Sequence, residues 1–157
     1  MKLAAVDIGS NSIHMVVVQA AADGSVEIID REKEMIRLGA AVYEHGVLTP
    51  ESIQQGLTVL RTFRTLAERH HVDEILTVAT AATREAGNGG EFLEAIQTET
   101  GLPVRLITGD EEARLIYLAV RNAIELKGHR ALLVDIGGGS VEVSVGDREQ
   151  LHAVQSL

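Results

Sequence analysis

The sequence of 157 residues contains no cysteine and no tryptophan, and aromatic residues make up only 3% of it. Without cysteine the chain has no disulfide, no thiolate zinc site and no cysteine nucleophile, which fits a reducing cytoplasm. No apolar run approaches the roughly 20 residues of a membrane span, and the first residues lack the layout of a signal peptide. We therefore expect a cytoplasmic protein with an aliphatic core and no membrane span.

Positive charge is also scarce, because 14 Lys and Arg residues face 23 Asp and Glu residues, for a formal net charge of −9. Nucleic-acid binders rely on phosphate neutralisation and on aromatic stacking platforms, so we expect no nucleic-acid partner. The length suffices for a substantial core, since a chain of about 150 residues buries roughly 70% of its unfolded surface. Size and composition indicate one globular domain, or one domain and part of another.

The hydrophobic pattern predicts an α/β fold. Strands are expected over residues 3–8, 13–20, 26–29, 75–79, 104–107, 131–136 and 141–145, and helices over residues 49–70, 89–99 and 108–126. The order is βββαβαβα followed by a strand pair, which favours a mixed sheet. We place the domain boundary after residue 128, so that residues 1–128 form one domain and residues 129–157 begin a second.

An imperfect repeat is the most informative feature. Asp-Ile-Gly-Ser-Asn-Ser at residues 7–12 returns 128 residues later as Asp-Ile-Gly-Gly-Gly-Ser at residues 135–140. Each copy lies between an incoming apolar strand and an outgoing strand. Small residues in such a turn let backbone N–H groups approach an anion, and Asp7 or Asp135 at the strand end can hold a divalent cation. Two tight hairpins without a ligand are the alternative, although the duplication favours paired phosphate loops facing each other, as in actin-like phosphotransferases.

Four further side chains are candidates for chemistry. Glu112 lies in the first turn of a predicted helix, at the head of its apolar stripe, where it can deprotonate a water; acids there also offset the helix dipole. Asp135 and Glu142 lie on the two arms of the second hairpin and can face one cation, although Glu142 alone also fits an exposed strand position. Arg84 follows a buried strand, where a guanidinium suits phosphate, although a surface ion pair is the simpler interpretation.

These segments together resemble the exopolyphosphatase and guanosine pentaphosphate phosphatase (Ppx/GppA) family. The resemblance rests on residues 5–12, 79–89, 107–118 and 134–142, which occur in the family's order. It implies the ribonuclease H-like fold of the actin-like ATPase superfamily. It also implies a hydrolase that releases the terminal phosphate of inorganic polyphosphate, or the 5′ γ-phosphate of pppGpp, with Mg²⁺ or another divalent cation.

The resemblance assigns roles to individual residues. By it, Glu112, Asp135 and Glu142 are the catalytic residues, with Glu112 activating water. Asp7, Asp135 and Glu142 are the expected metal ligands. The residues expected to bind phosphate are Gly9, Ser10, Asn11, Ser12, Arg84, Gly137, Gly138, Gly139 and Ser140.

Exopolyphosphatase activity is the favoured function, and three others remain open. They are pppGpp hydrolysis by the same site, phosphorylation by an actin-like kinase, and non-catalytic sensing of a phosphate or nucleotide. The family's second domain continues past the second loop, so we expect this chain to be the N-terminal portion of a longer protein and to have little activity alone. Unpaired strand edges in residues 131–157 are expected to favour a homodimer or other self-association.

Overall fold

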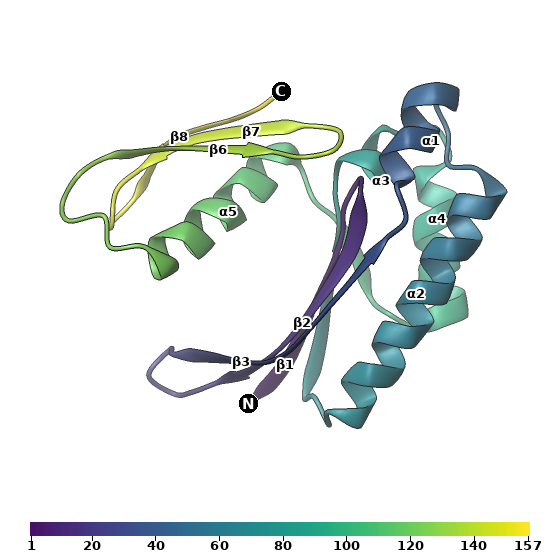
Figure 1. Cartoon of the computed structure of the whole chain (residues 1–157), viewed down its shortest axis with the longest axis horizontal. Helices are drawn as coiled ribbons and strands as arrows, with labels where there is room; N and C mark the ends of the chain where they lie inside the picture. Colours follow the sequence, from purple (N-terminus) through teal and green to yellow (C-terminus); the bar gives the residue numbers. More distant parts are fainter. The chain divides into compact units, whose positions relative to one another are not determined.

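A computed structural model describes residues Met1–Leu157, which divide into two compact units, Met1–Leu106 and Ile107–Leu157. Each unit has a sheet of its own (Figure 1). The helix that follows residue 108 belongs to the second unit, because it packs on the second sheet. The units thus divide earlier in the chain than the boundary expected after residue 128.

The sheet of the first unit has five strands. They are β1 (Lys2–Ile8), β2 (Ser12–Ala20), β3 (Val26–Met35), β4 (Glu74–Ala79) and β5 (Val104–Leu106), in the spatial order β3-β2-β1-β4-β5. β1 pairs antiparallel with β2 and parallel with β4, and β4 pairs parallel with β5. The sheet is therefore mixed, as the sequence predicted.

Helices of the first unit pack on one face of this sheet. They are α1 (Leu38–His45), α2 (Pro50–Arg69), α3 (Ala81–Glu85) and α4 (Gly89–Ala95), and α4 continues into a π-helical turn, η1 (Ile96–Thr100). The long helix α2 begins where the sequence indicates, because the Thr49 hydroxyl oxygen accepts the Ser52 N–H at 3.2 Å and Pro50 occupies the first turn. α2 and α4 lie side by side along the sheet (Figure 1).

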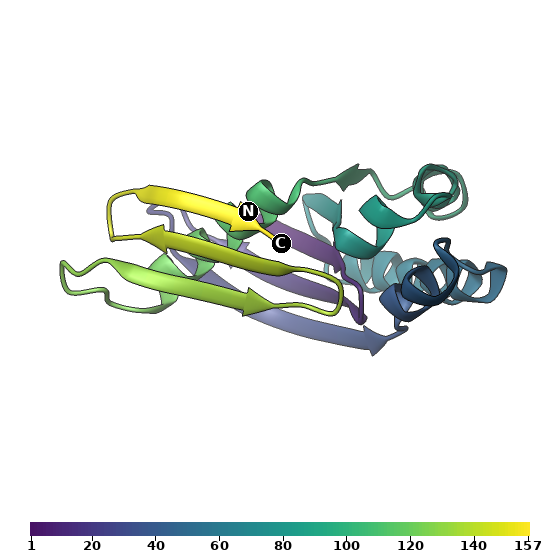
Figure 2. The ribbon, with the colours of Figure 1, turned by 90° about the horizontal axis from the view of Figure 1, so that it is seen from above.

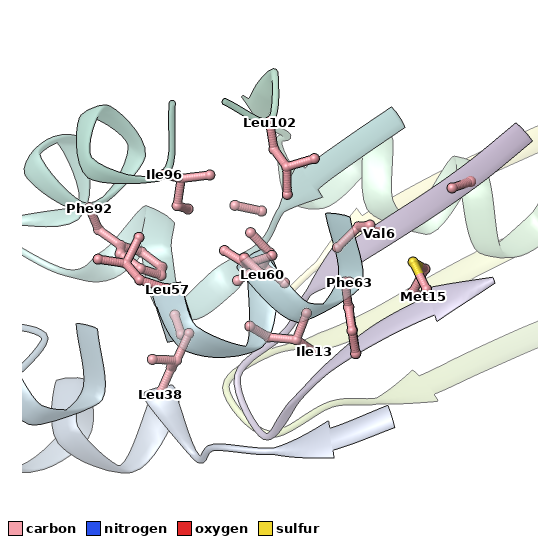
Figure 3. Packing of buried hydrophobic residues seen from close by; sticks show 14 of the residues in the cluster. Val6, Ile13, Met15, Leu38, Leu57, Leu60, Phe63, Phe92, Ile96 and Leu102 are labelled. Carbon is pink, nitrogen blue, oxygen red and sulfur yellow. The ribbon is translucent and has the colours of Figure 1, made fainter. Parts of the chain in front are cut away.

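The core of this unit is aliphatic with two phenylalanines, as the composition requires. Alternate residues of β1 and β2, among them Val6 and Ile13, point toward the apolar stripe of α2, which contributes Leu57, Leu60 and Phe63 (Figure 3). Phe92, Ile96, Leu38 and Leu102 close the core from the remaining elements. All of these side chains are buried. The sheet and α2 pack together because apolar residues alternate along the strands and recur at helical spacing along α2.

The second unit is a three-stranded antiparallel sheet with one helix. Helix α5 (Gly109–Ala123) packs on strands β6 (Ala131–Ile136), β7 (Val141–Gly146) and β8 (Leu151–Ser156), whose order is β6-β7-β8 (Figures 1 and 2). Tyr117 fixes the packing, because its hydroxyl donates to the Asp147 carbonyl at 2.7 Å and its ring lies directly over Gly146. A Cβ on Gly146 would lie 2.3 Å from that ring, so no other residue fits there without a shift.

Several elements differ from the prediction. β3 extends through Met35, because its second half is an exposed edge whose charged side chains give no apolar signal. Helices α1 and α3 have eight and five residues, too short for a helical period to be read from sequence. α5 ends at Ala123, since Ile124 is already extended, and β8 adds a third strand to the predicted pair.

Strands β6 and β8 form the edges of the second sheet, and β6 exposes Leu132, Val134 and Ile136 on one face. Self-association through these edges stays a prediction. No helix in the chain is both long enough and apolar enough to cross a membrane.

Candidate functional site

The first candidate loop joins β1 to β2. Asp7 pairs with His14 and Ile8 pairs with Ile13 across the hairpin, and the Gly9 N–H donates to the Ser12 carbonyl at 3.1 Å. A Cβ on Gly9 would lie 3.2 Å from that carbonyl oxygen, a distance tighter than most real Cβ contacts. The tight turn therefore favours glycine at this position.

The segment between β3 and α1 holds this loop in place. The Asn11 carbonyl accepts from the N–H groups of Ile36 and Arg37, at 3.1 and 2.9 Å, and the Ser10 carbonyl accepts from the Gly39 N–H at 2.8 Å. These hydrogen bonds use the carbonyl oxygens of the loop and leave the N–H groups of Ser10 and Asn11 out. Backbone N–H groups left over in such a turn can donate to an anion such as a phosphate oxygen.

Arg84 follows β4, which ends on the same side of the first sheet as β1. Ile8, the last residue of β1, pairs with Ala79, the last residue of the parallel strand β4, and the Thr80 N–H donates to the Ile8 carbonyl at 3.2 Å. The loop and helix α3 therefore leave adjacent strands at one end, with half-buried Arg84 in α3. The structure thus places Asp7, the first loop and the helix that carries Arg84 at the ends of neighbouring strands of one unit.

The second candidate loop, between β6 and β7, repeats the geometry of the first. Asp135 pairs with Glu142 and Ile136 with Val141, so both pairs match the first hairpin after a shift of 128 residues. The Gly137 N–H donates to the Ser140 carbonyl at 3.0 Å, and a Cβ on Gly137 would again lie 3.2 Å from that carbonyl oxygen. The repeat seen in the sequence is therefore a repeat of strand register, backbone hydrogen bond and steric constraint.

Asp135 and Glu142 lie side by side across β6 and β7, with both side chains on one face, because opposite residues of an antiparallel pair share a face. Asp135 is exposed, whereas Glu142 is only 2% exposed. The Ser156 hydroxyl donates to Glu142 Oε1 at 2.9 Å, and the buried Oε2 accepts no hydrogen bond. A buried carboxylate with one donor is costly unless a cation or further donors compensate it.

The residues expected to bind metal fit a magnesium ion in kind. They are carboxylates, the hard oxygen ligands that Mg²⁺ takes one or two at a time beside substrate phosphates. The uncompensated Oε2 of Glu142 also fits a cation. Within neither unit do three His, Asp or Glu side chains form a ready cluster.

Glu112 lies in the first turn of α5, which begins at the end of the second unit where the β6–β7 turn lies (Figure 1). The N-cap is as predicted, since the Thr108 hydroxyl oxygen accepts the Glu111 N–H at 3.2 Å. The buried residues of α5 are Gly109, Ala113 and Tyr117, which recur every four residues along one side of the helix. Glu112 lies one position before Ala113 and therefore belongs to the neighbouring row. Glu112 is thus half-buried at the border of the packed face, which corrects its expected place on the inward stripe.

Sequence reasoning missed two polar neighbours of the site. His14 Nε2 lies 2.7 Å from the Ser12 hydroxyl, and Ser156 is the donor to Glu142. The shift of 128 residues already places His14 at the position of Glu142, a signal that the sequence contains. Ser156 had no such signal, because β8 was not predicted.

Comparison with known proteins settles the family. Residues 16–157 match the model of the Ppx/GppA phosphatase family. This chain belongs to the Ppx/GppA phosphatase family. The match covers most of the chain and includes Arg84, Glu112 and the whole second hairpin.

Solved structures agree with this assignment. An exopolyphosphatase from Cytophaga hutchinsonii superposes with a TM-score of 0.95 at 29% identity, over 100% of this chain and 50% of that one. The Ppx/GppA family member of Aquifex aeolicus superposes with a TM-score of 0.86 at 37% identity, over 100% of this chain and 51% of that one. The chain therefore spans about half the length of these family members.

A more distant structure supports the fold alone. The ethanolamine utilization protein EutJ of Carboxydothermus hydrogenoformans has a TM-score of 0.55 at 17% identity, over 100% of this chain and 52% of that one. With the strand order of the first sheet, these similarities confirm the predicted ribonuclease H-like α/β fold.

Proposed function

We propose that the protein containing this chain hydrolyses the terminal phosphoanhydride bond of inorganic polyphosphate. The observation that carries the proposal is the duplicated loop, with matching register, backbone hydrogen bond and glycine constraint at Gly9 and Gly137. Family membership and the similarity to the Cytophaga hutchinsonii exopolyphosphatase support the same reaction.

In this proposal each loop binds phosphoryl oxygens of the substrate. The first loop supplies the N–H groups of Ser10 and Asn11 and the hydroxyl of Ser12, and the second supplies residues 137–140. Arg84, at the same sheet edge as the first loop, binds a phosphate with its planar guanidinium, whose paired N–H groups match two phosphate oxygens. The short loops add selectivity for phosphate without a broad basic surface, in keeping with the net charge of −9.

Glu112 acts as general base. It accepts a proton from water while the water oxygen bonds to the terminal phosphorus, and the bond to the bridging oxygen breaks, releasing phosphate and a chain shorter by one unit. Asp7, Asp135 and Glu142 are the residues that would hold Mg²⁺ or another divalent cation. When bound, the cation would offset negative charge on the phosphate oxygens.

The test measures phosphate release from polyphosphate by the full-length protein as wild type and as Glu112→Gln. The neutral amide has the size of the carboxylate but cannot accept the proton, so we expect a loss of about 10²- to 10⁴-fold in kcat. Asp110→Asn is the matched control, because Asp110 is an exposed acid in the same helical turn. Equal rates for wild type and Glu112→Gln would remove Glu112 from the mechanism.

Other substrates are separated by the same assay. Faster release from pppGpp than from polyphosphate would reassign the substrate while keeping the site. Transfer of phosphate from ATP to an acceptor would indicate a kinase, and tight binding of polyphosphate without any release would indicate a sensor.

A further inference from the structure

His14 is the histidine next to the first predicted phosphate loop. The backbone hydrogen bond that closes the loop, from Gly9 to Ser12, does not involve its side chain. Its Nε2 lies 2.7 Å from the hydroxyl oxygen of Ser12, a residue that is 7% exposed at the end of the loop. His14 itself is half-buried on β2, on the sheet face opposite to the core residues Ile13 and Met15. Core packing therefore does not explain the histidine.

The direction of the hydrogen bond decides what the Ser12 hydroxyl can do. A serine hydroxyl has one hydrogen to donate and two lone pairs that accept. If Ser12 donates to His14, it has no hydrogen left for a phosphate oxygen, which only accepts. If His14 Nε2–H donates to Ser12, the hydroxyl hydrogen is left for the ligand and its direction is restricted.

The second hairpin provides an internal comparison. Asp7 pairs with His14 in the first hairpin, and Asp135 pairs with Glu142 at the equivalent position in the second. Glu142 Oε1 accepts a hydrogen bond from Ser156, so the second hairpin carries an acceptor where the first carries an imidazole that can donate. A donor suits a loop that presents a hydroxyl to an anion, whereas a buried acceptor suits a loop that holds a cation.

We propose that His14 is a positioning residue of the first phosphate loop, whose Nε2–H holds the Ser12 hydroxyl so that it donates to a phosphoryl oxygen of the substrate. This role rests on the proposed function. It gives the first hairpin an imidazole donor at the position where the second hairpin carries the carboxylate of Glu142.

Steady-state hydrolysis of polyphosphate by the full-length protein tests the proposal with a pair of variants at one position. His14→Gln keeps an N–H donor on a side chain of similar reach, and His14→Met has the size of glutamine without the donor. We expect His14→Met to raise KM roughly 2- to 10-fold, the value of one hydrogen bond, with kcat nearly unchanged. We expect His14→Gln to restore most of the wild-type KM.

A double-mutant cycle with Ser12→Ala distinguishes this role from a structural one. If His14 acts through Ser12, His14→Met has no further effect on KM once the hydroxyl is gone. Val16→Ala is the control, because Val16 is a half-buried residue two positions along on the same strand face. Its KM is expected to equal that of the wild type.

Three results would overturn the proposal. They are equal KM values for His14→Gln and His14→Met, an unchanged KM in His14→Met, and multiplicative effects of Ser12→Ala and His14→Met. If His14→Met does not fold, His14→Ala, which also lacks a donor, takes its place in the comparison with His14→Gln and in the cycle with Ser12→Ala. Absence of hydrolysis and of polyphosphate binding in the wild type would instead refute the proposed function.

Discussion

Glu142 offers the sharpest prediction, because one of its carboxylate oxygens is buried without a hydrogen-bond partner. The side chain is 2% exposed, Oε1 accepts one hydrogen bond from Ser156, and the buried Oε2 accepts none. Burying a carboxylate costs several kcal/mol unless it is compensated. We therefore expect the folded protein to bind Mg²⁺ through Glu142 and the unfolded chain to lose this binding.

The size of the expected stabilisation follows from the coupling between cation binding and folding. A cation that binds only the folded state raises the free energy of unfolding by about 2.7 kcal/mol when its concentration is 100 times its Kd. Glu142→Gln keeps an oxygen that can accept from Ser156 but removes the negative charge. This variant is expected to show less than about 0.5 kcal/mol of Mg²⁺-dependent stabilisation at the same concentration, a level typical of non-specific effects.

The assay is urea unfolding of the full-length protein in MgCl₂ and in KCl of equal ionic strength. Glu125→Gln is the control, because Glu125 is an exposed acid that follows α5, outside the predicted site. Its Mg²⁺-dependent stabilisation should match that of the wild type. Equal stabilisation of wild type and Glu142→Gln would show that Glu142 holds no cation.

Three further predictions concern the fold that carries the site. Gly146→Ala places a Cβ 2.3 Å from the Tyr117 ring, so we expect unfolding in urea to show a loss of about 1–3 kcal/mol. Thr49→Ala removes the N-cap of α2 and is expected to lower the free energy of unfolding by about 1 kcal/mol in the same assay. The backbone N–H groups of Gln150 and Glu149, followed by the His152 ring, lower the pKa of Asp147 to about 2. Asp147→Asn should therefore destabilise the protein at pH 7. The difference in free energy of unfolding between wild type and Asp147→Asn should be lost as the pH falls from about 4 to 2.

Each of these has a result that would contradict it. Gly90→Ala is the control for Gly146→Ala, because nothing lies near its added Cβ, and equal effects of the two would dismiss the steric argument. Thr49→Ser keeps the capping oxygen, so a loss as large as that of Thr49→Ala would point away from the cap. For Asp147, whose pKa is lowered on folding, the stabilisation is present above the pKa of the unfolded state; a difference from Asp147→Asn that grew toward pH 2 would have the wrong sign.

The sequence predicted the elements whose side chains face a core. Strands β1, β2 and β4 and helix α2 were found because their buried residues recur with the period of a strand or a helix, as Val6 and Leu57 illustrate. The outer half of β3 and strand β8 were missed, since an edge strand needs no apolar alternation to pair. The short helix α1 follows Arg37, whose left-handed backbone conformation is not a usual N-cap.

The sequence predicted the parts of the candidate site that occur in both turns. It did not predict the parts that depend on a contact with another side chain. Comparison of the two turns located both loops and the Asp135–Glu142 pair. The burial of Glu142, by contrast, depends on α5 and on Ser156 of a strand that the sequence did not reveal. The contact between His14 and Ser12 depends on side-chain conformation, which no spacing in the sequence specifies.

Both glycine turns are proposed to bind phosphoryl groups of one substrate, and amide chemical shifts examine this joint binding without relying on turnover. In the full-length protein, titration with inorganic tripolyphosphate in the presence of Mg²⁺ should shift the N–H signals of Ser10 and Asn11 together with those of Gly138 and Gly139, with one common Kd. A response confined to one turn, or two responses with different Kd values, would show that the turns do not share a ligand.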